Sequence, residues 1–175
     1  IVLSSLVAMQ QDNLKARLAY STVSQLSYVI LGAALFSPLS IVGAGMHIAM
    51  HAGGKITLFF CAGAIYVASG KTEISDMKGS GRVMPVTLFA FFVGALSVIG
   101  LPPLGGSWSK YYLALGAYEA GELVFIGVLM VSSLLNVAYL LPVVGRGYFS
   151  RPEGDTGQKP VIKEAPMFCL IPLCL

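Results

Sequence analysis

Charged residues are scarce in this sequence, and their absence from long stretches argues against an ordinary soluble domain. Asp, Glu, Lys and Arg make up 11% of the 175 residues, whereas 56% are hydrophobic. Soluble proteins carry roughly twice that share of charge. None of the four occurs in residues 18–36, 83–109 or 123–145. Each run is close to or longer than the roughly 20 residues that cross a bilayer as a helix. The sequence therefore predicts an all-α fold, a polytopic transmembrane helix bundle.

Other residues that would indicate a different class of protein are also few. The three cysteines, Cys61, Cys169 and Cys174, form no C-x-x-C pair, and we interpret them as small apolar residues. The two histidines are not part of an H-E-x-x-H motif, so we expect no metal and no cofactor. The net charge of +3 lies in loops and at a few positions within helices, which argues against nucleic acid as a partner.

Prolines, glycines and charges divide the chain into membrane spans. Pro102 and Pro103 are flanked by glycines, which predicts that one helix ends there and that another starts close to Trp108. The chain begins without Met and both ends lie in apolar runs, so we expect a fragment of a single membrane domain. The expected spans are residues 1–9, 18–36, 40–69, 84–100, 108–118 together with 123–148, and 165–175.

The loop charges predict a broken helix. Nine of the eleven Lys and Arg lie in three loops, at residues 10–17, 70–82 and 146–163. The positive-inside rule places all three on one side of the membrane. This holds if residues 108–118 and 123–148 form one crossing, interrupted near residues 119–122. The alternative is a short tilted helix followed by an interfacial turn. In transporters, a broken helix marks the ion or substrate site.

A row of titratable side chains lies in the most central expected span. His47, His51 and Lys55 recur at i, i+4 and i+8, so they fall on one helical face. Lys55 lies near the bilayer centre, where an ionised lysine exposed to lipid costs at least about 2.5 kcal/mol. We therefore expect the row to face other helices and to pass protons. The alternatives are a metal site and hydrogen bonding between helices.

Further polar residues extend the candidate site. Lys110 follows the double proline and is either part of the proton path or a lysine that reaches the headgroups. Glu119 and Glu122 are either acidic members of the broken-helix site or solvated turn residues. Lys15 and Arg17 suggest a membrane boundary. Three polar residues inside apolar spans are candidates for filling gaps in the path, namely Ser97, Ser132 and Asn136.

Three motifs, in this order along the chain, match a known family. Residues 14–26 read LKARLAYSTVSQL, and the family pattern is L-K-R-x-L-A-Y-S-T-x-S-Q/H-x. Residues 51–63 match H-x-x-x-K-x-x-L-F-x-x-A-G, with Gly53 and Gly54 where a bulkier pair is usual. Residues 100–110 match G-L/F-P-P-x-A/G-G-F-x-x-K, with Ser107 in place of the common aromatic residue. The chain thus resembles the proton-translocating antiporter-like membrane subunits of NADH:quinone oxidoreductase, membrane-bound hydrogenases and Mrp-type antiporters.

The resemblance implies a fragment of the second inverted repeat and a role for particular residues. It assigns an early transmembrane lysine to Lys15, a central hydrophilic axis to His47, His51 and Lys55, and an exit half-channel on a discontinuous helix to Lys110.

Within that family the chain looks most like the D subunit of the Mrp antiporters. The expected function is proton translocation in monovalent cation (Na⁺ or K⁺)/proton antiport, without enzymatic chemistry. The expected partners are the lipid bilayer and other membrane subunits of a complex in a bacterial inner membrane. Two alternatives stay open, a non-redox proton-pumping subunit of an oxidoreductase or hydrogenase, and a structural membrane subunit without translocation.

Overall fold

The described part of the chain is built from helices alone, as predicted. The computed structural model describes residues 1–77 and 79–149, in which the only β-type pairing is an isolated bridge between Asn13 and Glu73. The predicted last span, residues 165–175, with Cys169 and Cys174, lies outside the described residues. The elements are α1 (Val2–Gln10), α2 (Leu14–Leu35), α3 (Pro38–Ser69), the 3₁₀ turn η1 (Ile74–Met77), α4 (Ser80–Val83), α5 (Pro85–Ile99), α6 (Gly105–Glu119) and α7 (Leu123–Phe149).

A tight turn joins α2 to α3, and its residues explain why both helices end there. Phe36 ends α2 in the left-handed conformation, with φ of 50°. Ser37 then caps α3, because its hydroxyl accepts the backbone N–H of Ser40 at 3.1 Å. The Ser40 hydroxyl in turn accepts the Ser37 N–H at 3.0 Å, which completes a capping box. Pro38 occupies the first turn of α3, where its missing N–H costs nothing.

The double proline separates α5 from α6, as predicted. Helix α5 ends at Ile99, Gly100 adopts a left-handed φ of 88°, and the Pro102–Pro103 peptide bond is cis. Helix α6 begins at Gly105, three residues before Trp108. The two segments approach so closely that a Cβ atom on Gly106 would collide with the backbone oxygen of Ser97.

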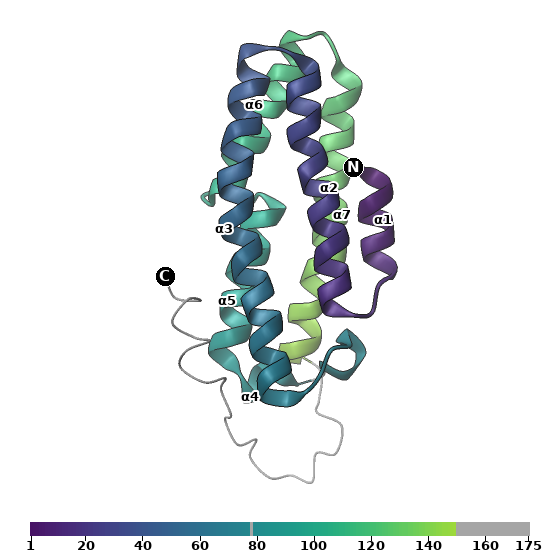
Figure 1. Ribbon diagram of the computed structural model, residues 1–175, viewed down its shortest axis with the longest axis vertical. Helices are drawn as coiled ribbons and strands as arrows, with labels where there is room; N and C mark the ends of the chain where they lie inside the picture. Colours follow the sequence, from purple (N-terminus) through teal and green to yellow (C-terminus); the bar gives the residue numbers. More distant parts are fainter. Residues whose placement is uncertain (78, 150–175) are drawn as a thin grey trace.

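The interrupted crossing is therefore not the one that the loop charges suggested. We predicted a break near residues 119–122, but α6 and α7 run antiparallel there, whereas α5 and α6 follow each other along the bundle (Figure 1). Length is the reason. The 15 residues of α5 rise about 22 Å and cannot cross a hydrocarbon core of about 30 Å. Helix α7 has 27 residues and is long enough alone. The charge rule predicted one interrupted crossing in this part of the chain, and the structure has the interruption between α5 and α6 instead.

Charged loops meet at one end of the bundle. The turns after α2 and α6 lie at the upper end in Figure 1, and the connections after α1 and α3 lie at the lower end. At that lower end the Arg146 guanidinium lies 4.0 Å from the Asp12 carboxylate. Asp12 also accepts the Ser75 backbone N–H at 3.2 Å, and its carbonyl accepts the Ile74 N–H at 2.9 Å. The described parts of all three basic loops are thus on the same side.

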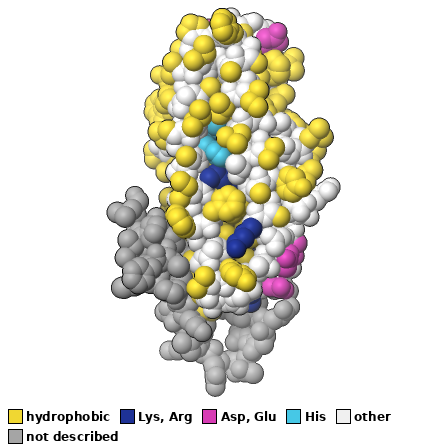
Figure 2. Space-filling view, in the orientation of Figure 1, with side chains coloured by type: hydrophobic (Ala, Val, Ile, Leu, Met, Phe, Trp, Pro, Cys, Tyr) yellow, Lys and Arg dark blue, Asp and Glu magenta, His cyan; other side chains and the backbone are white. Residues whose placement is uncertain are grey.

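The outer surface is apolar and the interior contains many polar groups. Three helices are long and apolar enough to span a membrane, α2, α3 and α7. Hydrophobic side chains cover most of the face seen in Figure 2. Buried polar side chains lie on α2, α3, α6 and α7, including Ser21, Gln25, His47, Lys55, Ser109 and Asn136. A lipid-facing exterior around a polar interior is the arrangement expected of a membrane protein that handles ions. The chain is an integral membrane protein with the predicted fold class.

Candidate functional site

The predicted row on α3 faces the interior. His47, His51 and Lys55 are 3%, 7% and 5% exposed, so the one-face spacing places all three against other helices. The two imidazole rings are nearly parallel, 9° apart, with their centroids 5.8 Å from each other. Lys55 is thus not exposed to lipid, which was the condition on which the prediction depended.

Lys55 donates its hydrogen bonds to α2. Its Nζ atom lies 2.7 Å from the Ser21 hydroxyl and 3.1 Å from the Leu18 carbonyl oxygen. The Ser21 hydroxyl also lies 2.7 Å from the Tyr139 hydroxyl on α7, which in turn contacts the Asn136 amide oxygen. A chain of four polar side chains therefore runs from α3 through α2 to α7.

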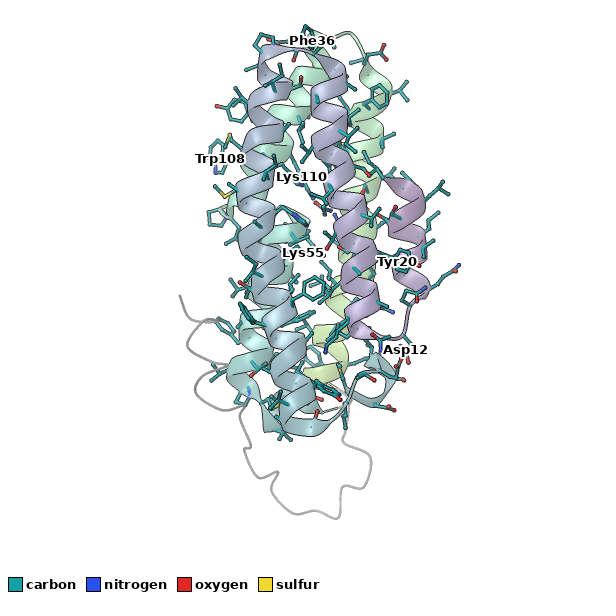
Figure 3. The ribbon with its side chains drawn as sticks, in the orientation of Figure 1. Asp12, Tyr20, Phe36, Lys55, Trp108 and Lys110 are labelled. Atoms are coloured by element: carbon teal, nitrogen blue, oxygen red, sulfur yellow. The ribbon has the colours of Figure 1, made fainter. Side chains whose placement is uncertain are left out.

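Lys110 lies beside the helix break rather than at the headgroups. Its Nζ atom donates to the Val98 carbonyl at 3.1 Å, the Ile99 carbonyl at 2.7 Å and the Ser133 hydroxyl at 3.2 Å. The two carbonyls close the C-terminal end of α5, where the free carbonyl groups of a helix favour a cation. The interfacial alternative for Lys110 is wrong, because its aliphatic chain folds back over Gly100 and its amine points inward (Figure 3).

Tyr28 lies between the histidine row and Lys110. Its ring centroid is 5.2 Å from that of His47 and 5.5 Å from the Lys110 amine. Its hydroxyl faces the side chains of Ser132, Ser133 and Asn136. The His47 Nδ1 atom is 3.0 Å from the hydroxyl of Ser109, one residue before Lys110. Ser109 and Tyr28 thus connect the row on α3 with the lysine on α6.

Several buried polar atoms in this region have no hydrogen-bond partner among the described residues. They come from α2, α3 and α7, and comprise both amide atoms of Gln25, the Tyr28 hydroxyl, Nε2 of His47, Nε2 of His51 and Nδ2 of Asn136. Buried polar groups in proteins are nearly always paired with protein or with ordered water. These atoms therefore define a part of the interior suited to water.

A surface groove between α2 and α3 reaches the row from outside. It has a volume of about 620 Å³, and its lining includes His51 and Lys55 together with apolar side chains such as Leu26 and Phe59. Figure 2 shows histidine atoms and atoms of lysine or arginine near mid-height, among hydrophobic side chains. The groove gives the interior row an opening.

The other predicted residues divide into those inside the site and those outside it. Ser132 and Asn136 are fully buried on α7 beside Tyr28, as expected of gap-filling residues. Lys15 is exposed at the edge of the groove, with its amine 4.8 Å from the Tyr66 ring centroid.

Ser97, the two glutamates and Arg17 lie elsewhere. Ser97 lines a different groove, between α3 and α5. Glu119 and Glu122 are exposed at the end of α6, so the interpretation as solvated turn residues holds. Arg17 is buried in the first turn of α2, and donates to the carbonyls of Gln11 at 2.8 Å and Tyr139 at 3.1 Å.

Sequence reasoning found Ser132 and Asn136 on α7 but missed the residues of α2 and Tyr139, which complete the site. Ser21, Gln25 and Tyr28 are spaced i, i+4 and i+7 on α2, and Ser132, Asn136 and Tyr139 repeat that spacing on α7. Each set forms one stripe of an otherwise apolar helix. The same test that singled out the row on α3 would have found both stripes. Within residues 1–77 and 79–149 no cluster of three His, Cys, Asp or Glu side chains could hold a metal, and Cys61 is buried with a free thiol.

Comparisons with known proteins identify the family of this chain. Residues 1–136 match the sequence profile of the family described as "NADH:quinone oxidoreductase/Mrp antiporter, TM". NADH-quinone oxidoreductase subunit N of Desulforudis audaxviator is 42% identical over 97% of this chain and 34% of its own length. The D subunit of a Na⁺/H⁺ antiporter from Alkalihalophilus pseudofirmus is 33% identical over 78% of this chain and 28% of its own length. In the structure of the Mrp complex from Dietzia sp. DQ12-45-1b, one chain superimposes with a TM-score of 0.83 at 28% identity, covering 91% of this chain and 30% of that one.

Proposed function

Since the chain belongs to the antiporter-like membrane subunits of the NADH:quinone oxidoreductase/Mrp antiporter family, we propose that it carries protons laterally between Lys55 and Lys110. The observation that carries the proposal is the pair of interior lysines on separate elements, α3 and α6. The chain spans about a third of the length of its relatives, so the complete path belongs to the full-length subunit.

Lysine in these surroundings can both hold and release a proton. Neither Lys55 nor Lys110 has a carboxylate partner among the described residues, and both amines are bonded to carbonyl and hydroxyl oxygens. Loss of the proton therefore leaves a neutral amine without leaving a buried carboxylate unpaired. Arginine in the same positions would stay charged at every stage.

The proposed path runs from Lys55 past His51 and His47 to Ser109 and Lys110. Proton transfer needs donor and acceptor within about 2.6–3.2 Å, or one water between them. The histidine ring centroids are 5.8 Å apart, so water bridges are part of the proposal. The unpaired atoms of the two histidines and of neighbouring side chains supply binding positions for that water.

The reaction that drives proton transfer is proposed from the relatives in the family, and it has two candidates. Exchange of protons for a monovalent cation, in a complex with other membrane subunits of a bacterial membrane, is our first candidate, since a relative named as the D subunit of a Na⁺/H⁺ antiporter shares 33% identity. Proton pumping within an NADH:quinone oxidoreductase is the second candidate. The 42% identity to a relative named subunit N favours it.

The test uses the full-length subunit in its native complex, reconstituted into vesicles with a pH-sensitive dye. We expect Lys55→Ala and Lys110→Ala each to abolish proton movement while the complex still assembles. Lys71→Ala is the matched control, because Lys71 is in the loop after α3 and its amine donates to the Asp76 carbonyl, away from both interior lysines. Driving the vesicles with a Na⁺ or K⁺ gradient, or with NADH and quinone, separates the two candidates. Full transport by Lys55→Ala would show that the polar row only packs the bundle.

A further inference from the structure

We propose that Ser21 and Tyr139 are positioning residues that hold the Lys55 ammonium on the α2 side, away from His51, and that relay its charge state to α7. This inference rests on the proposed function, because it concerns the lysine from which the proton is passed. It assigns a role to a hydroxyl pair that lies on neither the histidine row nor the helix break.

The direction of Lys55 is the first observation. Its Nζ atom has two partners among the described residues, the Ser21 hydroxyl and the Leu18 carbonyl oxygen, and both belong to α2. The neighbouring imidazole of His51 leaves its Nε2 atom without a partner. The lysine thus occupies an arrangement in which its proton is directed away from the next member of the row.

The second observation is that Tyr139 has one proton and two neighbouring oxygen atoms. Its hydroxyl contacts Asn136 Oδ1 and lies 2.7 Å from the Ser21 hydroxyl, and it can donate to either. While Lys55 is charged, Ser21 accepts from Lys55 and can donate its own proton to Tyr139, which leaves the Tyr139 proton for Asn136 Oδ1. All donors then point from Lys55 toward Asn136, which is the order that a charged lysine favours.

A neutral Lys55 reverses this order. When the proton has left Lys55 toward the histidine row, the amine lone pair accepts the Ser21 O–H, and Ser21 accepts the Tyr139 O–H. No covalent bond forms or breaks within the chain, because each hydroxyl keeps its own proton and only rotates. Asn136 Oδ1 then loses its donor.

The reversal carries the charge state of Lys55 to α7. Tyr139 and Asn136 both belong to α7 and both are fully buried, so the hydrogen bond between them is shielded from solvent.

The test compares single and double variants of the full-length subunit in reconstituted complexes. Tyr139→Phe and Ser21→Ala should each lower turnover about tenfold, the size expected for a hydrogen bond to a charged group. Because both act through one chain, the double variant should lose no more than either single one. Ser21→Thr, which keeps the hydroxyl, should recover most of the loss.

Two variants on the same helices serve as controls. Ser27→Ala on α2 removes a hydroxyl that donates to its own helix at Val23, and Tyr148→Phe on α7 removes one that donates to the Pro85 carbonyl. Both should transport like the unmodified complex. Losses in Ser21→Ala and Tyr139→Phe that multiply in the double variant would overturn the single-chain arrangement.

A spectroscopic readout separates positioning from simple packing. In infrared difference spectra with labelled tyrosine, the C–O band that disappears in Tyr139→Phe should shift in Lys55→Met, because the lysine donor is gone. An unshifted band would overturn the relay, whatever happens to transport. If Lys55→Ala is inactive and Tyr139→Phe is fully active, the positioning role fails and the proposed function stands. If Lys55→Ala transports fully, the proposed function fails. The shift of the Tyr139 C–O band in Lys55→Met then remains the test of the hydrogen-bonded chain.

Discussion

Lys55 and Lys110 both place an ammonium group inside the bundle, but different acceptors hold the two groups. Lys55 lies within a continuous helix and is held by a hydroxyl and one carbonyl of α2. Lys110 lies after a helix break and is held chiefly by two carbonyls at the end of α5. A hydroxyl can reverse its hydrogen bond by rotation, whereas a backbone carbonyl can only accept. The comparison indicates that the hydrogen bonding of Lys55 is adjustable and that the hydrogen bonding of Lys110 is fixed.

The largest expected loss of proton transport tests the property that the two sites share, a lysine that can release its proton. Lys55→Arg and Lys110→Arg should each lower proton transport by about 100-fold or more, because a guanidinium keeps its proton. Both variants should still assemble, since the charge and donors remain. The measurement is the initial rate of dye response in reconstituted vesicles. Normal transport by either variant would remove that lysine from the path.

The next largest effect comes from a steric clash at the helix break that holds Lys110. Gly106→Ala places a methyl group against the Ser97 carbonyl at the break between α5 and α6. We expect a loss of about 1–3 kcal/mol in stability, typical of overpacking, together with a lower transport rate. Thermal unfolding of the solubilised complex measures the first quantity. Gly45→Ala is the control, because nothing lies within 4 Å of a Cβ atom there. Equal melting temperatures for the two variants would contradict the close approach.

A smaller loss of turnover tests how strongly each lysine amine depends on its hydroxyl acceptor. Ser133→Ala removes one of three acceptors from Lys110 and leaves both carbonyls in place. We expect turnover to fall only about threefold, because the two carbonyl acceptors still hold the Lys110 amine. Ser21→Ala should cost more, because the hydroxyl is the only side-chain acceptor of Lys55 among the described residues. Side-by-side rates of the two variants test the ranking, and the reverse order would contradict it.

The smallest effect concerns the exposed lysine. Lys15→Gln removes a cation over the Tyr66 ring at the edge of the groove, 4.8 Å from its centroid. The contact lies outside the proposed path and contributes about 0.5–1 kcal/mol to stability, so we expect less than about a twofold change in transport. Transport rates across a range of salt concentrations measure it. A loss comparable to that of Lys55→Ala would place Lys15 within the path, as the family resemblance implied.

Much of the fold was predictable because hydrophobic length and proline chemistry act locally. The run without charge at residues 18–36 predicted α2, and Pro102 with Pro103 predicted the end of α5. The charge rule placed the basic loops on one side, but it could not tell which neighbouring segments share a crossing. That choice depended on the length of α5, which is too short to span alone.

The candidate site was predictable only along single helices. The spacing of His47, His51 and Lys55 showed one face, and the cost of exposing lysine to lipid turned that face inward. Distant partners such as Ser21 and Tyr139 were missed, because residues 118 positions apart meet only through packing. Ser97 was expected beside the path. It lines the groove between α3 and α5 instead, because only packing decides which side of α5 faces the path.

The sequence by itself determined the class of protein, the family and the inward row on α3, because composition, motifs and helical periodicity are properties of neighbouring residues. Only the tertiary structure decided which helix is broken, where the lysine amines point and which hydroxyls meet them. Those features depend on how α2, α5 and α7 pack around α3 and α6. A hydrogen bond forms only when packing brings donor and acceptor to within about 3 Å.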